Sequence, residues 1–195
     1  MTPPSRDVVL QISGISIDGF IALENTAFDA AATKLIDPQR DQWMVDSLNR
    51  AGVHIMGRVT YQAMANWWPN STEIFAEPMN RIPKVVFSRS LQSTPWGNDT
   101  RIVRGDIATE IAALKSEPGS EDILAHGGAA FGQSLAGADL VDEYRLIVYP
   151  FVVGSGTALF AGVTTPRHLD LKHAVTFPSG SAALVYRRPT SVHPA

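Results

Sequence analysis

Three short turns carry residue types that bind phosphate: Gly57-Arg58, Ser88-Arg89 and Gly127-Gly128 each end or follow an apolar, strand-like stretch. Glycine lets the backbone approach a ligand closely, and the unpaired N–H groups at the start of a following helix attract an anion. Arginine adds a planar fork of donors for phosphate oxygens. In a parallel sheet such turns share the edge at which α/β proteins bind ligands. Together the turns could hold the two ends of a dinucleotide.

Each turn also has a purely structural explanation. A single glycine at a strand end is common in ordinary turns, and Arg58 or Arg89 alone could be a solvated surface charge. The Gly127-Gly128 pair could simply permit close packing of a helix on a strand. The spacing Gly-x-Gly-x-x-Gly is not found, which disfavours a standard Rossmann domain.

The composition excludes several classes of protein. The 195 residues, 45% of them hydrophobic and 18% charged, predict one domain over 1–195 with loose tails at 1–6 and 189–195. A net charge of −3 without a basic run disfavours nucleic acid, and the apolar runs are too short to cross a bilayer. With no cysteine, disulfides, thiolate catalysis and thiolate-bound zinc are excluded, and the 5 histidines lack metal-like spacing. We expect a cytoplasmic protein without metal.

Alternating strand and helix patterns must position these turns. An Asp18-Gly19 turn follows the first strand, and 24–37 is expected to be a surface loop. The predicted strands cover 7–13, 53–56, 84–88, 100–104, 122–128 and 142–154, the helices 38–52, 58–68, 106–116 and 129–138, and a C-terminal hairpin 168–178 with 181–188. This order predicts an α/β sandwich with a mostly parallel sheet that ends in an antiparallel pair.

Several segments resemble one known family. "VHIMGRVTYQAM", "VVFSRS" and "ILAHGGAAFGQSL" are similar, in this order, to segments of the dihydrofolate reductase superfamily. "GADLVDEYRLIVYPFVVGSGTALF" resembles the branch represented by the reductase domain of riboflavin biosynthesis and its stand-alone bacterial relatives. The resemblance covers residues 7 to about 187. It implies a dihydrofolate reductase-like three-layer sandwich, a homodimer and NADPH as the cofactor.

The resemblance also implies the cofactor contacts. Ser88 and Arg89 would hold the 2′-phosphate of the adenosine ribose, which suits an arginine. The residues that would face the other phosphates, the pyrophosphate and the nicotinamide are Gly57, Arg58, Val59, Thr60, Gly127, Gly128, Ala129, Ala130 and Phe131.

Asp41 is the candidate catalytic acid on the substrate side. In the family an acid lies sixteen positions before the motif glycine, and counting back from Gly57 gives Asp41. A desolvated carboxylate there could deliver a proton. Alternatively, Asp41 is a first-turn helix acid stabilised by the helix dipole, since the riboflavin-type branch keeps no fixed acid here. Asp37 and Asp46 are less favoured alternatives.

Other residues could border the substrate. Asp18, near the segment that corresponds to the mobile loop over the nicotinamide, is more simply a turn residue, and His126 more simply a packed histidine. Trp67 and Trp68 could stack on a planar substrate or pack in the core. The segment 154–156 is more simply a turn at the exit of a strand than a phosphate nest, and the apolar segment 144–153 is a dimer interface or simply buried in the sheet. His54 is expected to be structural.

These features predict hydride transfer from NADPH to a C=N or C=O bond of a small planar heterocycle, a pterin or a pyrimidine. The activity would be related to that of 5-amino-6-(5-phosphoribosylamino)uracil reductase, although no basic cluster for a substrate phosphate is evident. A true dihydrofolate reductase and a non-catalytic, dimeric nucleotide-binding scaffold are the alternatives.

Overall fold

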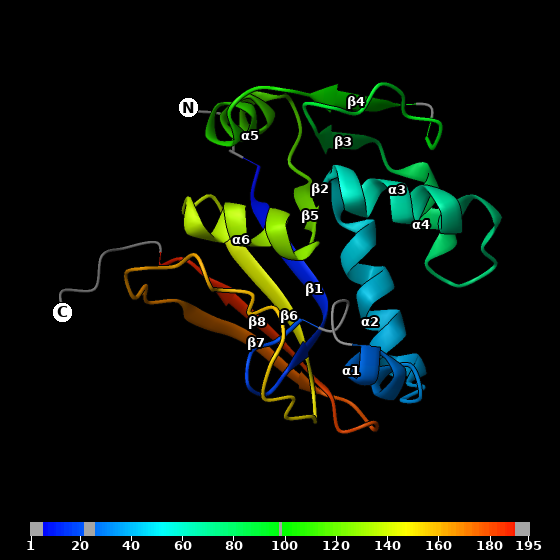
Figure 1. The fold of residues 1–195 in the computed structure, drawn as a ribbon, viewed down its shortest axis with the longest axis vertical. Coiled ribbons are helices and arrows are strands. Elements are labelled where there is room, and N and C mark those ends of the chain that lie inside the picture. Colours follow the sequence, from blue (N-terminus) through cyan, green and yellow to red (C-terminus); the bar gives the residue numbers. More distant parts are fainter. Residues whose placement is uncertain (1–5, 22–25, 98, 190–195) are drawn as a thin grey trace.

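The computed structural model describes residues 6–21, 26–97 and 99–189. Its strands form one sheet in the order β4-β3-β2-β5-β1-β6-β8-β7 (Figure 1). The strands are β1 Val8–Ser16, β2 Ala51–Gly57, β3 Lys84–Phe87, β4 Thr100–Val103, β5 Asp122–His126, β6 Glu143–Tyr149, β7 Asp170–Thr176 and β8 Ala182–Arg187. The helices are α1 Thr26–Ala32, α2 Pro38–Asn49, α3 Arg58–Trp67, the 3₁₀ turn η2 Trp68–Asn70, α4 Ala76–Arg81, α5 Ile107–Ser116 and α6 Ala129–Gly137.

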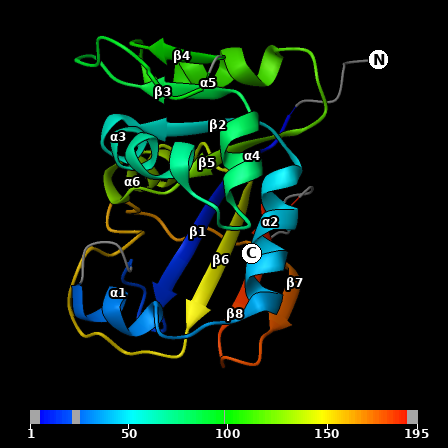
Figure 2. The same cartoon turned by 90° about the vertical axis from the view of Figure 1, so that its right-hand side faces the viewer.

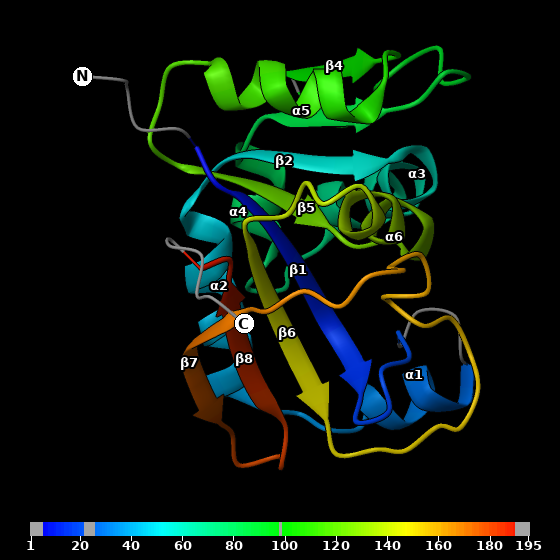
Figure 3. The ribbon, with the colours of Figure 1, turned by 90° about the vertical axis from the view of Figure 1, so that its left-hand side faces the viewer.

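The sheet is parallel from β4 to β6, and only β8 and β7 run antiparallel. Helices cover both faces, so the predicted three-layer sandwich with a C-terminal hairpin is confirmed. Figure 2 shows α2 and α4 on one face, and Figure 3 shows α5 and α6 on the other. Because β1 and β5 lie in the middle under helices on both sides, they are buried almost throughout.

Each face has its own apolar core. Under α5 and α6, Ile111 and Leu135 pack with strand residues such as Leu10 and Ile55. On the opposite face, the core contains residues of α2, α3 and α4 together with Val9, Met56, Val86 and Leu124. Because β2, β3 and β5 are packed on both faces, these two cores hold the ends of the three strands in place.

One irregularity interrupts the central strand β1. Ile12 pairs with Leu146 and Ile15 with Val148, so β1 has two residues where β6 has one. Such a β-bulge bends a strand and re-aims its side chains. Ser13, in the bulge, is the one exposed residue of β1.

Several predicted elements and boundaries are wrong, and the first strand, expected to end at 13, runs to Ser16. The expected loop over 24–37 contains α1, whose Phe28 packs edge-on against Tyr149 and Phe151. Of this range, 24–25 lies outside the described residues. The strand expected over 142–154 ends at Tyr149, before Pro150, which cannot donate to a sheet. The helix expected to run to Gly52 ends at Asn49, because β2 already begins at Ala51.

The ends of the chain meet the prediction only in part. The expected tails 1–6 and 189–195 lie outside the described residues except for Arg6 and Pro189. Arg6 is buried, and its Nε donates to the Glu121 carbonyl at 3.0 Å, so it belongs to the fold. Within the described part of the chain, no helix is long and apolar enough to cross a membrane. β6 lies between β1 and β8, so burial in the sheet explains its apolar residues, and the homodimer stays a prediction.

Candidate functional site

The three phosphate-type turns lie at one edge of the sheet. β3, β2 and β5 are parallel neighbours, and Gly57 pairs with Phe87 while Ile55 pairs with Ala125. The turns that follow these strands therefore emerge side by side. In Figure 3 the arrowheads of β2 and β4 and the starts of α3 and α6 lie on the same side of the molecule.

Two helices begin at this edge without a side-chain cap. Gly57 and Gly128 are the N-cap residues of α3 and α6. In contrast, Asp37 and Asp106 cap α2 and α5, each accepting two backbone N–H bonds. The first-turn N–H groups of α3 and α6 therefore remain available to an anion. A Cβ on Gly128 would lie 2.3 Å from Thr60 Oγ1, so the two helix starts are in close contact.

Both predicted arginines are exposed at this edge. Arg58 Nη1 donates to Gln62 at 3.0 Å, and neither Arg58 nor Arg89 has a carboxylate partner among the described residues. Ser88 is engaged in its own turn, because its Oγ accepts from the N–H groups of Ser90 and Leu91 at 3.2 and 2.9 Å. Free guanidinium groups suit a phosphate.

Arg104 is a third arginine at this edge, and it was not among the residues predicted from the sequence. Its guanidinium donates to the carbonyls of Ser88, Arg89 and Leu91 at 2.7 to 3.1 Å. It therefore fixes the turn that carries Ser88 and Arg89. The one signal in the sequence was its place at the end of the strand predicted over 100–104, an edge position shared with the three turns.

Other predicted cofactor residues differ in exposure. Val59 is exposed, Ala129 is half-buried and Ala130 is exposed. Phe131 is buried, and its ring centroid lies 5.0 Å from that of Phe87, so it packs in the core. A Cβ on Gly127 would lie 2.1 Å from Ile12 Cδ1, which means that close packing alone already requires a glycine there.

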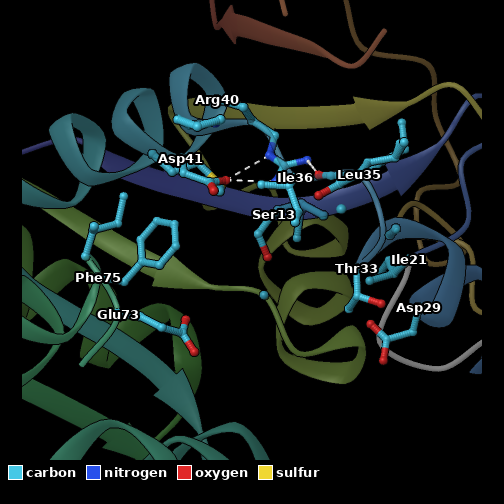
Figure 4. Close-up of a pocket in the computed structure, with 18 of the residues that line it drawn as sticks. Ser13, Ile21, Asp29, Thr33, Leu35, Ile36, Arg40, Asp41, Glu73 and Phe75 are labelled. Carbon is cyan, nitrogen blue, oxygen red and sulfur yellow. Dashed lines mark hydrogen bonds and ion pairs between the residues drawn. The ribbon is translucent and has the colours of Figure 1, made fainter. Parts of the chain in front are cut away.

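A cavity of about 800 Å³ opens beside these turns (Figure 4). Gly127 lines it on one side and Asp41 on another, and Ser13 and Gly14 of the β1 bulge form part of its wall. Figure 4 shows Ser13 between Asp29 and Thr33 on one side and Glu73 and Phe75 on the other. The cavity thus connects the cofactor-type edge with the predicted substrate-side acid.

Asp41 is held by its neighbour Arg40. Arg40 Nε and Nη2 donate to Asp41 Oδ1 at 3.0 and 2.8 Å, while Nη1 donates to the Leu35 carbonyl at 2.9 Å. No described donor reaches Asp41 Oδ2. Asp41 also lies in the first turn of α2, which is the position that the alternative of an acid stabilised by the helix dipole requires. The Tyr149 ring lies 5.3 Å from the Arg40 guanidinium carbon, and burial raises the pKa of the Tyr149 hydroxyl.

A smaller chamber of about 210 Å³ shares Ser13, Met44, Glu73 and Phe75 with this cavity. Its wall includes two predicted residues, Trp68 and His126.

His126 is buried, and its Nε2 has no hydrogen-bond partner in the described part of the chain. Burial, followed by the nearby charge of Lys84, lowers the pKa of His126 to about 4, so the imidazole is neutral at pH 7. His54 is fully buried, and its ring centroid lies 4.5 Å from that of His126. Its burial agrees with the expected structural role.

Four other predicted candidates lie outside both cavities or serve other contacts. Trp67 is 59% exposed and lines neither cavity. Asp37 caps α2 and accepts from the Ser179 N–H at 2.8 Å, and Asp46 accepts from Gln42. Asp18 accepts from Ser16 Oγ and from the N–H groups of 153 and 154, and these bonds, the Ser16 bond first, lower its pKa. Asp18 thus occupies N–H groups of the segment considered as a phosphate nest.

Most lining residues were not selected from the sequence, among them Ser13, Asp29, Glu73, Phe75 and Tyr149. These named residues come from the β1 bulge, α1, the connection before α4, and β6, and no local pattern marks them. Only the folded chain brings them together.

This sandwich, with glycine-capped helices and a cavity at its carboxyl edge, is a dihydrofolate reductase-like fold. The model of the RibD C-terminal domain family matches residues 7–183, so the chain belongs to this family. Two Bacillus subtilis (strain 168) proteins, the uncharacterized YyaP and YwjB, are 30% identical over 186 residues and 32% identical over 172. The matches cover 93% and 88% of this chain and 94% and 92% of those proteins.

Solved structures share the fold at low identity. A Shewanella sp. PV-4 protein assigned to riboflavin biosynthesis has a TM-score of 0.75 at 20% identity, with 94% of this chain and 99% of that chain covered. A Thermotoga maritima diaminohydroxyphosphoribosylaminopyrimidine deaminase/5-amino-6-(5-phosphoribosylamino)uracil reductase has a TM-score of 0.63 at 14% identity. The latter match covers 95% of this chain and 57% of the Thermotoga chain. Membership of the family supports an oxidoreductase of the riboflavin-reductase type.

Proposed function

We propose that the chain is an NADPH-dependent reductase that transfers hydride to a C=N or C=O bond of a small planar heterocycle of the pterin or pyrimidine type. One observation carries this proposal: a single cavity is lined by Gly127, at the edge with two uncapped helix starts, and by Asp41. The family supports the reductase class, and the edge supports a phosphorylated cofactor.

The residues at the edge fit the phosphates of such a cofactor. The first-turn N–H groups of α3 and α6 would bind the pyrophosphate, and Thr60 lies where these two helix starts meet. Arg58 and Arg89 would bind further phosphate oxygens, with the Arg89 turn held in place by Arg104. The 2′-phosphate distinguishes NADPH from NADH. We assign its binding to Ser88 and Arg89, because the family resemblance points to this turn and Arg89 is exposed there.

On the substrate side, Asp41 would orient the ring. Arg40 occupies Oδ1, and Oδ2 is left to accept an N–H of the substrate. When bound, NADPH would supply the hydride, and the substrate atom adjacent to the reduced carbon would take up a proton, for which Asp41 is the candidate donor. The walls formed by α1 and by the segment around Phe75 would limit access of water to this step.

The cofactor assignment is tested by titrating NADPH and NADH into the wild type and single variants. We expect Arg58→Ala or Arg89→Ala to weaken NADPH binding at least about tenfold, and Arg89→Ala to reduce the preference over NADH. Arg101→Ala is the matched control, because Arg101 is also exposed but pairs with Glu117. An unchanged preference for NADPH in Arg89→Ala would refute the assignment of the 2′-phosphate.

Turnover is tested by following NADPH absorbance with a panel of pterins, pyrimidines, flavins and carbonyl compounds. We expect consumption with a planar heterocycle and a loss of at least about tenfold in kcat/KM for Asp41→Asn, which keeps the shape but not the charge. Tight NADPH binding without consumption of any compound would instead identify a non-catalytic scaffold. Methotrexate-inhibited reduction of dihydrofolate would identify a dihydrofolate reductase.

A further inference from the structure

The cavity of about 800 Å³, called the outer cavity below, is lined by two carboxylates that have no partner among the described residues. Asp29 on α1 and Glu73 before α4 are exposed, and both line the cavity. In Figure 4 they lie on opposite sides of Ser13. Neither carboxylate has an ion-pair partner or a side-chain hydrogen bond within the described residues. The open part of the cavity is therefore negatively charged.

The basic side chain that lines the same cavity, Arg40, is already engaged. All three of its guanidinium nitrogens donate, two to Asp41 and one to the Leu35 carbonyl. Its side chain is only 7% exposed. A substrate phosphate would have to break these bonds in order to reach it, and removing a partner from a buried charge is costly. Among the described lining residues there is no second Lys, Arg or His in this cavity.

The smaller chamber of about 210 Å³, called the inner chamber below, is lined mainly by apolar side chains, and Glu73 stands at its border with the larger cavity. Phe75, Trp68 and three methionines give it an apolar wall, which suits a flat ring. His126 is more than nine-tenths buried, and its Nε2 is unpartnered among the described residues. A neutral imidazole offers one donor and one acceptor, so it can hydrogen-bond a ring atom without attracting a charge.

From this division we infer that the substrate is an unphosphorylated planar ring compound, neutral or cationic, with N–H donors that face the carboxylates of the outer cavity. The ring would lie against Phe75 in the inner chamber. The inference rests on the proposed function, because it takes the cavity as the substrate side of the cofactor edge. It separates this chain from the Thermotoga protein, whose named substrate carries a phosphoribosyl group.

The test uses two ligands that differ by one phosphate, 5-amino-6-(ribosylamino)uracil and its 5′-phosphate, together with 2,4-diaminopteridine. Each is titrated calorimetrically into the protein with and without saturating NADPH. We expect the unphosphorylated compound to bind at least about tenfold more tightly than its phosphate, and 2,4-diaminopteridine to bind as well. We expect Glu73→Lys to reduce the difference between the pair at least about fivefold, with Glu73→Gln in between.

Asp46→Lys is the matched control, since Asp46 is an exposed carboxylate of α2 that lines neither cavity. It should leave the ratio of the two affinities unchanged, and thermal denaturation verifies that each variant is folded. Equal or tighter binding of the phosphate by the wild type, or no binding of any of the three compounds, would overturn the inference. Failure of NADPH to bind would instead overturn the proposed function, and the titrations without NADPH would still decide the charge preference.

Discussion

A methyl group on Gly127 would lie 2.1 Å from the tip of Ile12, in the core of the sheet. At the scale of single residues, the glycine pair therefore has a steric reason to be there, whatever it binds. Sequence alone allowed a cofactor loop or close packing of a helix on a strand. The contact with Ile12 favours a residue without a side chain at 127, and the cofactor role stays a prediction that needs its own experiment.

We expect Gly127→Ala to lower the free energy of unfolding by about 1–3 kcal/mol, because the buried Ile12 must move aside. In Ile12→Val the clashing Cδ1 is missing, and the next atom is the Gln11 carbonyl oxygen at 3.6 Å. Urea denaturation of both single variants and the double variant measures the coupling. The double variant should lose less stability than the sum of the single losses.

Gly132→Ala on α6 is the control, because its nearest neighbour, Leu159 Cδ1, is at an ordinary 3.5 Å. It should be neutral or stabilising by up to about 1 kcal/mol. Strictly additive losses for Gly127→Ala and Ile12→Val would contradict the steric assignment.

At the scale of elements, the starts of the four longest described helices divide into two kinds. α2 and α5, with aspartate caps, have their first N–H groups satisfied by the protein itself. α3 and α6 have glycine caps, and no side chain accepts from their first N–H groups. This division is visible in the sequence, since Asp106 and the glycines stand at the predicted boundaries. It is the part of the site that sequence could predict best.

We expect Gly57→Asp to keep or slightly raise the stability, since the new carboxylate would cap α3 and the backbone at φ −79° and ψ 165° suits any residue. The same carboxylate should weaken NADPH binding at least about tenfold, because its charge would occupy the proposed phosphate position. Denaturation and NADPH titration are measured on the same sample.

Asp106→Ala provides the reverse control for this experiment. It should cost about 1 kcal/mol of stability and leave NADPH affinity unchanged, because α5 belongs to no proposed phosphate contact. If Gly57→Asp binds NADPH as the wild type does, the start of α3 holds no phosphate.

The two walls of the cavity formed by α1 and by the segment before α4 could not be predicted from sequence patterns. α1 has 7 residues and α4 has 6, too few for a helical period to stand out, and tertiary packing holds them. Phe28, for example, packs α1 against the rings of Tyr149, at the end of β6, and Phe151, just beyond it. Asp29, Glu73 and Phe75 come from these segments, so they could not be selected in advance.

At the scale of the whole molecule, a polar row crosses the middle of the sheet on the α2 side. His54 is paired in register with Lys84, and Gln11 with His126 and Arg145. Arg145, Gln11 and Ser47 are joined by hydrogen bonds of 2.8 and 2.5 Å. At the other end, both His54 nitrogens lack a partner in the described chain. Strands distant in sequence build this row, so only the strand order reveals it.

This row should make the protein sensitive to acid. Burial lowers the pKa of His126 from 6.5 to about 4 and that of His54 well below its usual value. The unfolded chain therefore binds protons between pH 6.5 and 4 while the folded chain resists them. We expect the free energy of unfolding to fall by a few kcal/mol over that interval and to be unaffected by these histidines above it. Urea denaturation from pH 7.5 to 4.5 measures this loss.

His54→Leu removes one of the two buried imidazoles and should flatten the loss of stability between pH 6.5 and 5. His168→Ala is the control, because the His168 side chain is 71% exposed and should not alter the profile. A wild-type stability that does not change between pH 7 and 5 would show that the two buried histidines do not resist protonation.

Between Ile12 and Ile15 the sheet needs one residue, and the chain supplies two. Because side chains alternate between the faces of a strand, removing either Ser13 or Gly14 would leave Ile12 and Ile15 on the same side as before. The core would keep its contacts, while the residue that remains between Ile12 and Ile15 would pair regularly with β6. The length of this segment is therefore a requirement of the chamber and not of the sandwich. Deletion of one residue is the smallest edit that should keep this architecture and remodel the wall on which a ligand would rest.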